Sequence, residues 1–190
     1  TTEIYTLSLH DALPICLDRD QRVVYVGSLS KTLAPGLRLG FIVGPAPLIR
    51  EARALRRLML RHPPANNQRA AGLFIALGHH EALLRRRRHV LRDRAEAMRR
   101  ALDRHLPGLR HQGGAGGSAY WLHGPPGLST RGLAARAAGR GVLIEPGDVF
   151  FMGDTPPANY LRLGFSSIPA ERIEPGLAQL AALLHPVAAE

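Results

Sequence analysis

The stretch from Val23 to Gly40 constrains this chain more than any other, because it sets one lysine between two apolar segments. Val23 to Val26 is an apolar, β-branched run, which predicts a buried strand. Small and hydroxylated residues follow around Lys31, and Pro35-Gly36 predicts a turn. A second apolar run, Leu39 to Val43, comes directly after the turn. The stretch therefore predicts a strand that leads into a loop presenting one amine.

Lys31 is the only lysine among 25 Lys+Arg residues, so the other 24 are arginines. Arginine serves wherever only a positive charge is needed, but it cannot lose its proton and attack a carbonyl. Schiff-base chemistry is therefore one explanation of why this position holds a lysine. A surface lysine that survived by chance is the alternative at this point.

The residues around Lys31 resemble the cofactor lysine motif of pyridoxal-phosphate (PLP) enzymes of fold type I, with Ser-x-Ser-Lys-Thr-Leu-x-Pro followed by Leu-Arg-Leu-Gly. The seven-residue step from Lys31 to Arg38 is similar to that of MocR-type regulators and 2-aminoadipate-type aminotransferases. The resemblance implies that Lys31 forms the internal aldimine with PLP and later moves the substrate proton. It also implies that Ser28, Ser30 and Arg38 hold the cofactor phosphate, whose oxygens suit hydroxyls and a planar guanidinium.

Two later motifs strengthen the resemblance to class I aminotransferases. Val-x-x-x-Pro-Gly-x-x-Phe begins at Val142, and Asn-Tyr-Leu-Arg-Leu-Gly-Phe-Ser begins at Asn159. In the second motif, alternation predicts a strand with one buried face, and an arginine within such a strand needs a partner. The resemblance implies that Arg162 binds the α-carboxylate of the substrate. An edge-strand salt bridge is the alternative.

The fold class expected from the resemblance is α/β, the C-terminal part of the PLP-dependent transferase fold (aspartate aminotransferase-like). Residues 16–88 are expected to form a partial PLP-binding large domain, and residues 89–190 an α+β small domain. Residues 1–15 do not fit the family and resemble translated sequencing-adapter read-through, so we expect this segment to be non-native. The usual upstream phosphate loop, the ring-stacking aromatic and the ring-nitrogen aspartate are not recognisable.

Apolar spacing predicts the remaining elements. Four helices are predicted at 48–61, 80–106, 128–139 and 169–184. A further helix is predicted between the first two, capped by Asn66 or Asn67 and ending at Gly78. The predicted strands are 118–122 and 142–144, besides the Arg162 strand. Tyr120 and Trp121 are candidates to line the substrate pocket, with core packing expected for at least one. The run Arg85–Arg88 indicates either a nucleic-acid contact or a solvated helix face whose arginines pair with acidic residues three or four positions away.

Composition and sequence patterns limit the partners, the cellular location and the metal sites that we expect. A net charge of +10 permits a nucleic-acid partner, but the arginines are dispersed along predicted helices. One cysteine, Cys16, fits a reducing compartment, and neither a secretory pattern nor an apolar run of about 18 residues is present, so we expect a cytoplasmic protein that does not contact membranes. His79 and His80 are adjacent rather than at ligand spacing, and we expect no metal site.

Two functions follow from the resemblance. The first is a PLP-dependent aminotransferase that moves an amino group between an amino acid and a 2-oxo acid. The alternative is the effector-sensing domain of a MocR/GntR-type transcription regulator, which would contact DNA only through a missing N-terminal domain. In either case the full-length protein is expected to be a homodimer, and this chain alone is expected to be a poor or inactive transaminase. A basic nucleic-acid-binding or structural domain is a remote alternative, because the aromatic content is only 5%.

Overall fold

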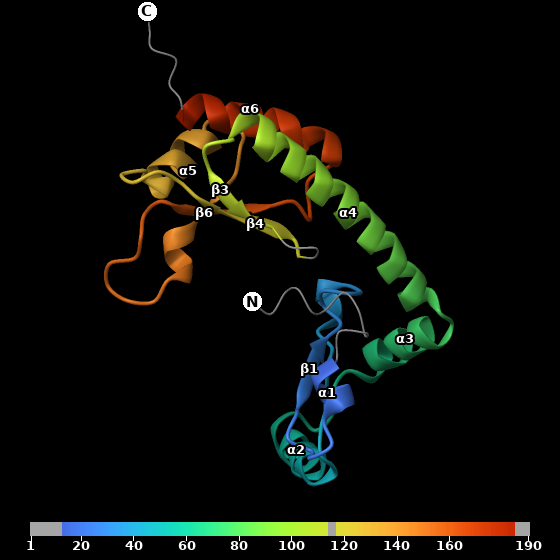
Figure 1. Ribbon diagram of the computed structural model, residues 1–190. Coiled ribbons are helices and arrows are strands. Elements are labelled where there is room, and N and C mark those ends of the chain that lie inside the picture. Colours follow the sequence, from blue (N-terminus) through green and yellow to red (C-terminus); the bar gives the residue numbers. More distant parts are fainter. Residues whose placement is uncertain (1–12, 114–116, 185–190) are drawn as a thin grey trace, which may run out of the picture. The chain divides into compact units, whose positions relative to one another are not determined.

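The computed structural model describes residues 13–113 and 117–184, shown in colour in Figure 1. The chain divides into unit 1, Thr1–Arg88, and unit 2, His89–Glu190. The segment predicted to be non-native lies mostly outside the described residues, as does the centre of the glycine-rich stretch at 113–117. The assignment of the units to a large and a small domain stays a prediction.

Unit 1 is built around a hairpin. After the short helix α1 (Leu13–Leu17), strand β1 (Tyr25–Ser28) pairs antiparallel with β2 (Gly40–Val43), and a short 3-10 turn, η3 (Pro35–Leu37), lies in the loop between them. Helices α2 (Ala46–Leu60) and α3 (Ala65–Ala76) follow the hairpin, as the blue and teal segments of Figure 1 show.

Two predictions for unit 1 are wrong in part. The strand β1 forms, but it is not buried: Val26 is 68% exposed, because β2 is its one partner strand among the described residues and no helix there covers this side chain. Helix α3 begins at Ala65 after Pro64, so Asn66 and Asn67 lie within its first turn and do not cap it. The predicted end at Gly78 is confirmed by its positive φ of 78°.

Unit 2 is a four-stranded antiparallel sheet with helices on one face. The long helix α4 (His79–His105) leads into it, and the strands are β3 (Arg110–Gln112), β4 (Ala119–His123), β5 (Glu145–Pro146) and β6 (Tyr160–Gly164), in the order β3-β4-β6-β5. Helix α5 (Thr130–Ala138), the 3-10 turn η4 (Gly147–Phe150) and helix α6 (Ala170–Leu184) complete it. Figure 1 shows α6 and the end of α4 side by side above the sheet.

The core of unit 2 follows from alternation along the strands. Leu161 and Leu163 of β6 and Leu122 of β4 are at most 5% exposed and face the helices. The helices supply the rest of the cluster, which includes Met98, Leu102, Leu133, Ile173, Leu177 and Leu180. Because side chains of a strand point alternately to opposite faces, the residues between the core positions lie on the other face. The predicted buried face of the Arg162 strand is therefore confirmed.

The strand predicted at 142–144 is wrong by a few residues. Val142 N–H donates to Ala137 O at 2.9 Å, so it completes the end of α5 and does not pair with a strand. Pairing with β6 begins only at Glu145, which lies opposite Arg162. The chain must leave the helix before it can extend along the sheet, and this displacement decides which residue faces the arginine.

None of the helices in residues 13–113 and 117–184 combines the length and apolar character needed to cross a bilayer.

Candidate functional site

Strands β1 and β2 form the base of the loop that carries Lys31. Ser28, at the end of β1, lies opposite Gly40, at the start of β2. Leu29 N–H then donates to Leu39 O at 2.9 Å, so the backbone pairing continues one residue beyond the strands. This pairing holds the two ends of the loop together. The side chains at the start and at the end of the loop therefore lie at the same end of the hairpin, although they are separated in sequence.

Four of the predicted site residues lie at this end of the hairpin: Ser28, Ser30, Lys31 and Arg38. Ser28 Oγ accepts a hydrogen bond from Ser30 N–H at 3.3 Å. Arg38 has a left-handed backbone, with φ 49° and ψ 38°, where the 3-10 turn ends. Such a conformation is uncommon outside glycine, and it marks a sharp change of chain direction before β2. The hairpin thus presents one amine, two hydroxyls and one guanidinium.

Close packing at the hairpin leaves no room for a side chain at Gly27. A Cβ atom there would lie 2.2 Å from the ring of Phe41, which faces it across the hairpin. The glycine lets the aromatic ring cover the backbone immediately before Ser28. The loop therefore leaves β1 from a tightly packed position.

Two side chains that sequence reasoning missed hold the loop in place. Arg87, in α4, donates from Nη1 to Lys31 O at 2.6 Å and to Thr32 O at 3.2 Å. Asn67, in α3, donates from Nδ2 to Leu37 O at 3.3 Å. The backbone on both sides of the turn is therefore bound by side chains from two helices.

The contacts of Arg85 and Arg87 show what two arginines of the run Arg85–Arg88 bind. Arg85 pairs with Glu81 at 2.6 Å, which confirms the predicted helix-face pairing at that position. Further along α4, Arg99 pairs in the same way with Glu96 at 2.8 Å. Arg87 differs, because its partners are backbone carbonyls far away in sequence. No local spacing distinguishes it from its neighbours, so only the tertiary contact identifies it.

The fifth predicted residue, Arg162, lies in unit 2 at the centre of β6. Its cross-strand neighbours are Trp121 of β4 and Glu145 of β5. Arg162 Nη1 donates to Glu145 Oε2 at 2.8 Å, which confirms that the arginine has a partner within the sheet. Four of the predicted residues thus lie on one hairpin of unit 1, and Arg162 lies on the sheet of unit 2.

Aromatic rings cover the same sheet face as Arg162. Trp121 stacks on Tyr160, with centroids 5.7 Å apart, and Tyr160 stacks on His123 at 4.4 Å. Phe150 and Phe151, which follow β5, contact the Trp121 ring at 5.5 and 6.0 Å. Tyr120 instead points into the core, where burial raises the pKa of its phenol, so the expectation of core packing for one of the two aromatics is confirmed.

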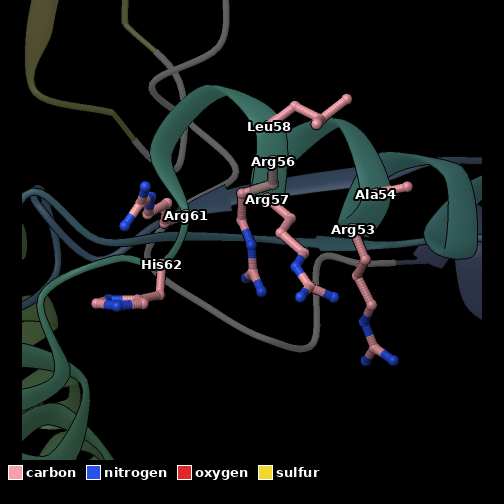
Figure 2. Close-up of a pocket in the computed structure, with 7 residues that line it drawn as sticks. All are labelled: Arg53, Ala54, Arg56, Arg57, Leu58, Arg61 and His62. Carbon is pink, nitrogen blue, oxygen red and sulfur yellow. The ribbon is translucent and has the colours of Figure 1, made fainter.

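A separate groove of about 730 Å³ runs along α2 and is shown in Figure 2. Its lining is strongly basic and consists of Arg53, Ala54, Arg56, Arg57, Leu58, Arg61 and His62. In the figure, the side chains of Arg53, Arg56 and Arg57 extend from one side of the helix. The groove contains none of the predicted cofactor residues, so we do not take it as the cofactor site.

The comparison with protein families agrees with the three motifs. The model of aminotransferase class I and II matches residues 3–180, which is most of the chain. This chain belongs to the aminotransferase class I and II family. The predicted α/β aminotransferase-like fold and the pyridoxal phosphate prediction are therefore confirmed at the level of the family.

The curated relatives of this aminotransferase-family chain include both regulators and enzymes. It is 46% identical over 169 residues to the HTH-type transcriptional regulator TauR of Rhodobacter capsulatus, covering 89% of this chain and 35% of the regulator. It is 36% identical over 159 residues to the 2-aminoadipate transaminase of Thermus thermophilus, covering 83% of this chain and 40% of the enzyme. The chain thus spans well under half the length of these relatives.

Solved aminotransferase structures match the fold. The α-aminoadipate aminotransferase LysN from Thermus thermophilus, complexed with N-(5'-phosphopyridoxyl)-L-leucine, has a TM-score of 0.78 and 33% identity, over 95% of this chain and 47% of the enzyme. The kynurenine aminotransferase of Pyrococcus horikoshii has a TM-score of 0.78 and 30% identity, over 88% of this chain and 42% of the enzyme.

The groups on the hairpin fit a pyridoxal cofactor by their chemistry. An exposed amine on Lys31 can condense with an aldehyde, while the hydroxyls of Ser28 and Ser30 and the guanidinium of Arg38 are donors for a phosphate. All four come from one short segment whose ends are held by backbone pairing. The donor set of the hairpin is thus suited to an aldehyde that carries a phosphate group.

Proposed function

We propose that this chain is the cofactor-lysine and carboxylate-binding part of a PLP-dependent protein that acts on, or senses, an amino acid. Lys31 would hold PLP covalently, and Ser28, Ser30 and Arg38 would bind its phosphate. Arg162 would bind the carboxylate of the amino acid. The observation that carries the proposal is the hairpin, which presents the only lysine of the chain beside two hydroxyls and a guanidinium.

The residues have distinct tasks in this proposal. When bound, PLP supplies an electron sink for the carbon next to the amino group. Lys31 Nζ, once free of the cofactor, would accept and return the proton of that carbon. The hydroxyls and Arg38 fix the phosphate by charge-assisted hydrogen bonds, while the guanidinium of Arg162 orients the substrate through its carboxylate.

For the parent protein we favour the MocR-type regulator, in which the same residues recognise an effector. The specific support is the 46% identity to TauR, against 36% to the 2-aminoadipate transaminase. The second candidate is an aminotransferase, which uses the same lysine and arginine for amino-group transfer with a 2-oxo acid. In both, we propose a cytoplasmic homodimer, and only the regulator would bind DNA, through a domain upstream of this chain.

The coding sequence upstream of the Cys16 codon separates these two parents. A reading frame that continues into a PLP domain and then a winged-helix domain supports the regulator. A frame that starts at the PLP domain supports the free-standing aminotransferase. If genomic sequence confirms residues 1–15 as written, the prediction that this segment is non-native fails.

The site itself is tested by trapping PLP on the protein. Incubation with PLP and reduction with borohydride should add one phosphopyridoxyl group, and peptide mass spectrometry should locate it on Lys31. The chain has no other lysine, so the N-terminal amine is the one competing primary amine. Lys31→Arg keeps the charge and should abolish both the adduct and the imine absorbance. An equal adduct on the variant would contradict the proposal.

A further inference from the structure

The ion pair between Arg162 and Glu145 lies where the proposed function needs a vacant guanidinium. The two residues face each other across β5 and β6, and Nη1 lies 2.8 Å from Oε2. Their side chains are 31% and 47% exposed, so a ligand from solvent can reach both. A carboxylate of the chain thus already binds the arginine that is proposed to take the carboxylate of the amino acid.

The surroundings favour a firm pair rather than a loose surface contact. Trp121 flanks Arg162 on the other strand, and its ring stacks on Tyr160, two residues before the arginine. The Arg162 side chain is 31% exposed, so most of it is withdrawn from water, which strengthens the attraction of its guanidinium to a carboxylate. The backbone pairing of Glu145 with Arg162 also keeps the two side chains in register, so little ordering is needed to form the pair.

A guanidinium binds one carboxylate best, through two parallel N–H donors. A second carboxylate at the same place meets the negative charge of the first, and like charges at short range repel. The carboxylate of a ligand must therefore displace Glu145 from Arg162, or bind beside it at a cost.

We infer that Glu145 is an internal competitor for Arg162 that lowers the affinity of the site for carboxylate ligands. This inference rests on the proposed function, in which Arg162 is the carboxylate site. Glu145 acts through Arg162 and is a specificity-determining residue: it weakens the binding of simple carboxylates, while uncharged ligands of the same shape are not affected by its charge.

The test measures the binding of propionate, with propionamide as its uncharged counterpart, to the 190-residue chain labelled uniformly with ¹⁵N. The Arg162 Nε–Hε resonance, identified by its loss in Arg162→Leu, is followed during each titration. Glu145→Gln removes the competing charge and keeps the size of the side chain. The Kd for propionate should fall roughly two- to fivefold, as expected for release of a partly exposed ion pair, and propionamide should bind equally to both proteins.

Two variants provide controls. Glu174→Gln also breaks an ion pair with an arginine of unit 2, Arg104, and should leave propionate binding unchanged. Glu145→Ser removes the charge with a different side chain and should tighten propionate in the same way as Glu145→Gln, which keeps the test valid if one of the two variants fails to fold.

The outcomes separate the inference from the function on which it rests. If propionate perturbs the backbone amides of β6 equally in the wild type and in Arg162→Leu, Arg162 is not the carboxylate site and the proposed function fails. If Arg162→Leu abolishes this response but neither Glu145 variant binds propionate more tightly than the wild type, only the inference fails. Glu145 would then orient the arginine rather than compete for it.

Discussion

A single arginine side chain fixes the backbone that carries Lys31. Arg87 Nη1 reaches two successive carbonyls, those of Lys31 and Thr32, and hydrogen bonds from a charged donor are stronger than those from a neutral one. Its neighbour Arg86 is exposed on the same helix. The two arginines are equivalent in sequence, and their different settings provide a matched pair for mutagenesis.

At this scale we expect Arg87→Gln to weaken PLP binding at Lys31 by about tenfold, because it removes the charge-assisted hydrogen bonds to the Lys31 and Thr32 carbonyls. Arg86→Gln should bind PLP like the wild type. Arg87→Lys, which keeps one charged donor, should recover part of the affinity. The measurement is the imine absorbance as a function of PLP concentration, and equal affinities for Arg87→Gln and Arg86→Gln would rule out a positioning role.

At the scale of elements, helices α4 and α6 are held together by charged side chains as well as by the apolar core. Arg104 and His105 of α4 both contact Glu174 of α6. The hydrogen bond from Arg104, with a smaller contribution from His105, lowers the pKa of the Glu174 carboxyl below its usual value of 4.5. A carboxyl whose pKa is lower in the folded state stabilises the fold above its unfolded pKa, and this stabilisation is lost as the pH falls through the folded pKa.

We therefore expect a small stabilising effect of Glu174 at neutral pH that disappears in acid. The thermal midpoint of the wild type should exceed that of Glu174→Gln at pH 7. The difference should shrink as the pH falls below about 4.5 and disappear once the pH lies below the lowered pKa of the folded state, where the carboxyl is protonated in both states. A difference that is constant across this range, measured by circular dichroism, would show that the charge of Glu174 plays no part.

The two units differ, on the scale of the whole chain, in how much apolar surface they bury. In unit 2 the sheet and three helices share one cluster, in which Leu102, Leu161 and Leu180 are fully buried. In unit 1, large apolar side chains of α2 stay open to solvent, with Leu58 83% and Met59 76% exposed. Burial of apolar area is the main source of folding free energy, so the units should differ in local stability.

Hydrogen exchange followed by mass spectrometry tests this difference in the isolated chain. Amides of β4, β6 and α6 should exchange slowly, whereas those of β1, β2 and α2 should exchange at least tenfold faster, because little apolar burial opposes their opening. Similar protection in both units would contradict the expectation and would indicate that unit 1 is stabilised by contacts outside its own elements.

Local patterns were sufficient to predict most of the helices and strands. The spacing of apolar residues predicted α2, α4, α5 and α6 to within a few residues, and the alternation around Arg162 predicted which side of β6 is buried. These features depend on the period of helix and strand, which any short segment displays by itself. The Lys31 motif predicts four cofactor-binding residues that lie on one hairpin, and their roles stay a prediction.

Contacts between distant segments could not be predicted in this way. Nothing in the run Arg85–Arg88 distinguishes the arginine that binds the Lys31 loop. The helix propensity of 65–76 likewise does not show that Asn67, a predicted cap, binds the carbonyl of Leu37 instead. The sequence by itself determined the elements, the lysine and the family. Only the tertiary structure decided that Glu145 faces Arg162, because the register of β5 on β6 depends on where α5 ends and on which side chains the core can accept.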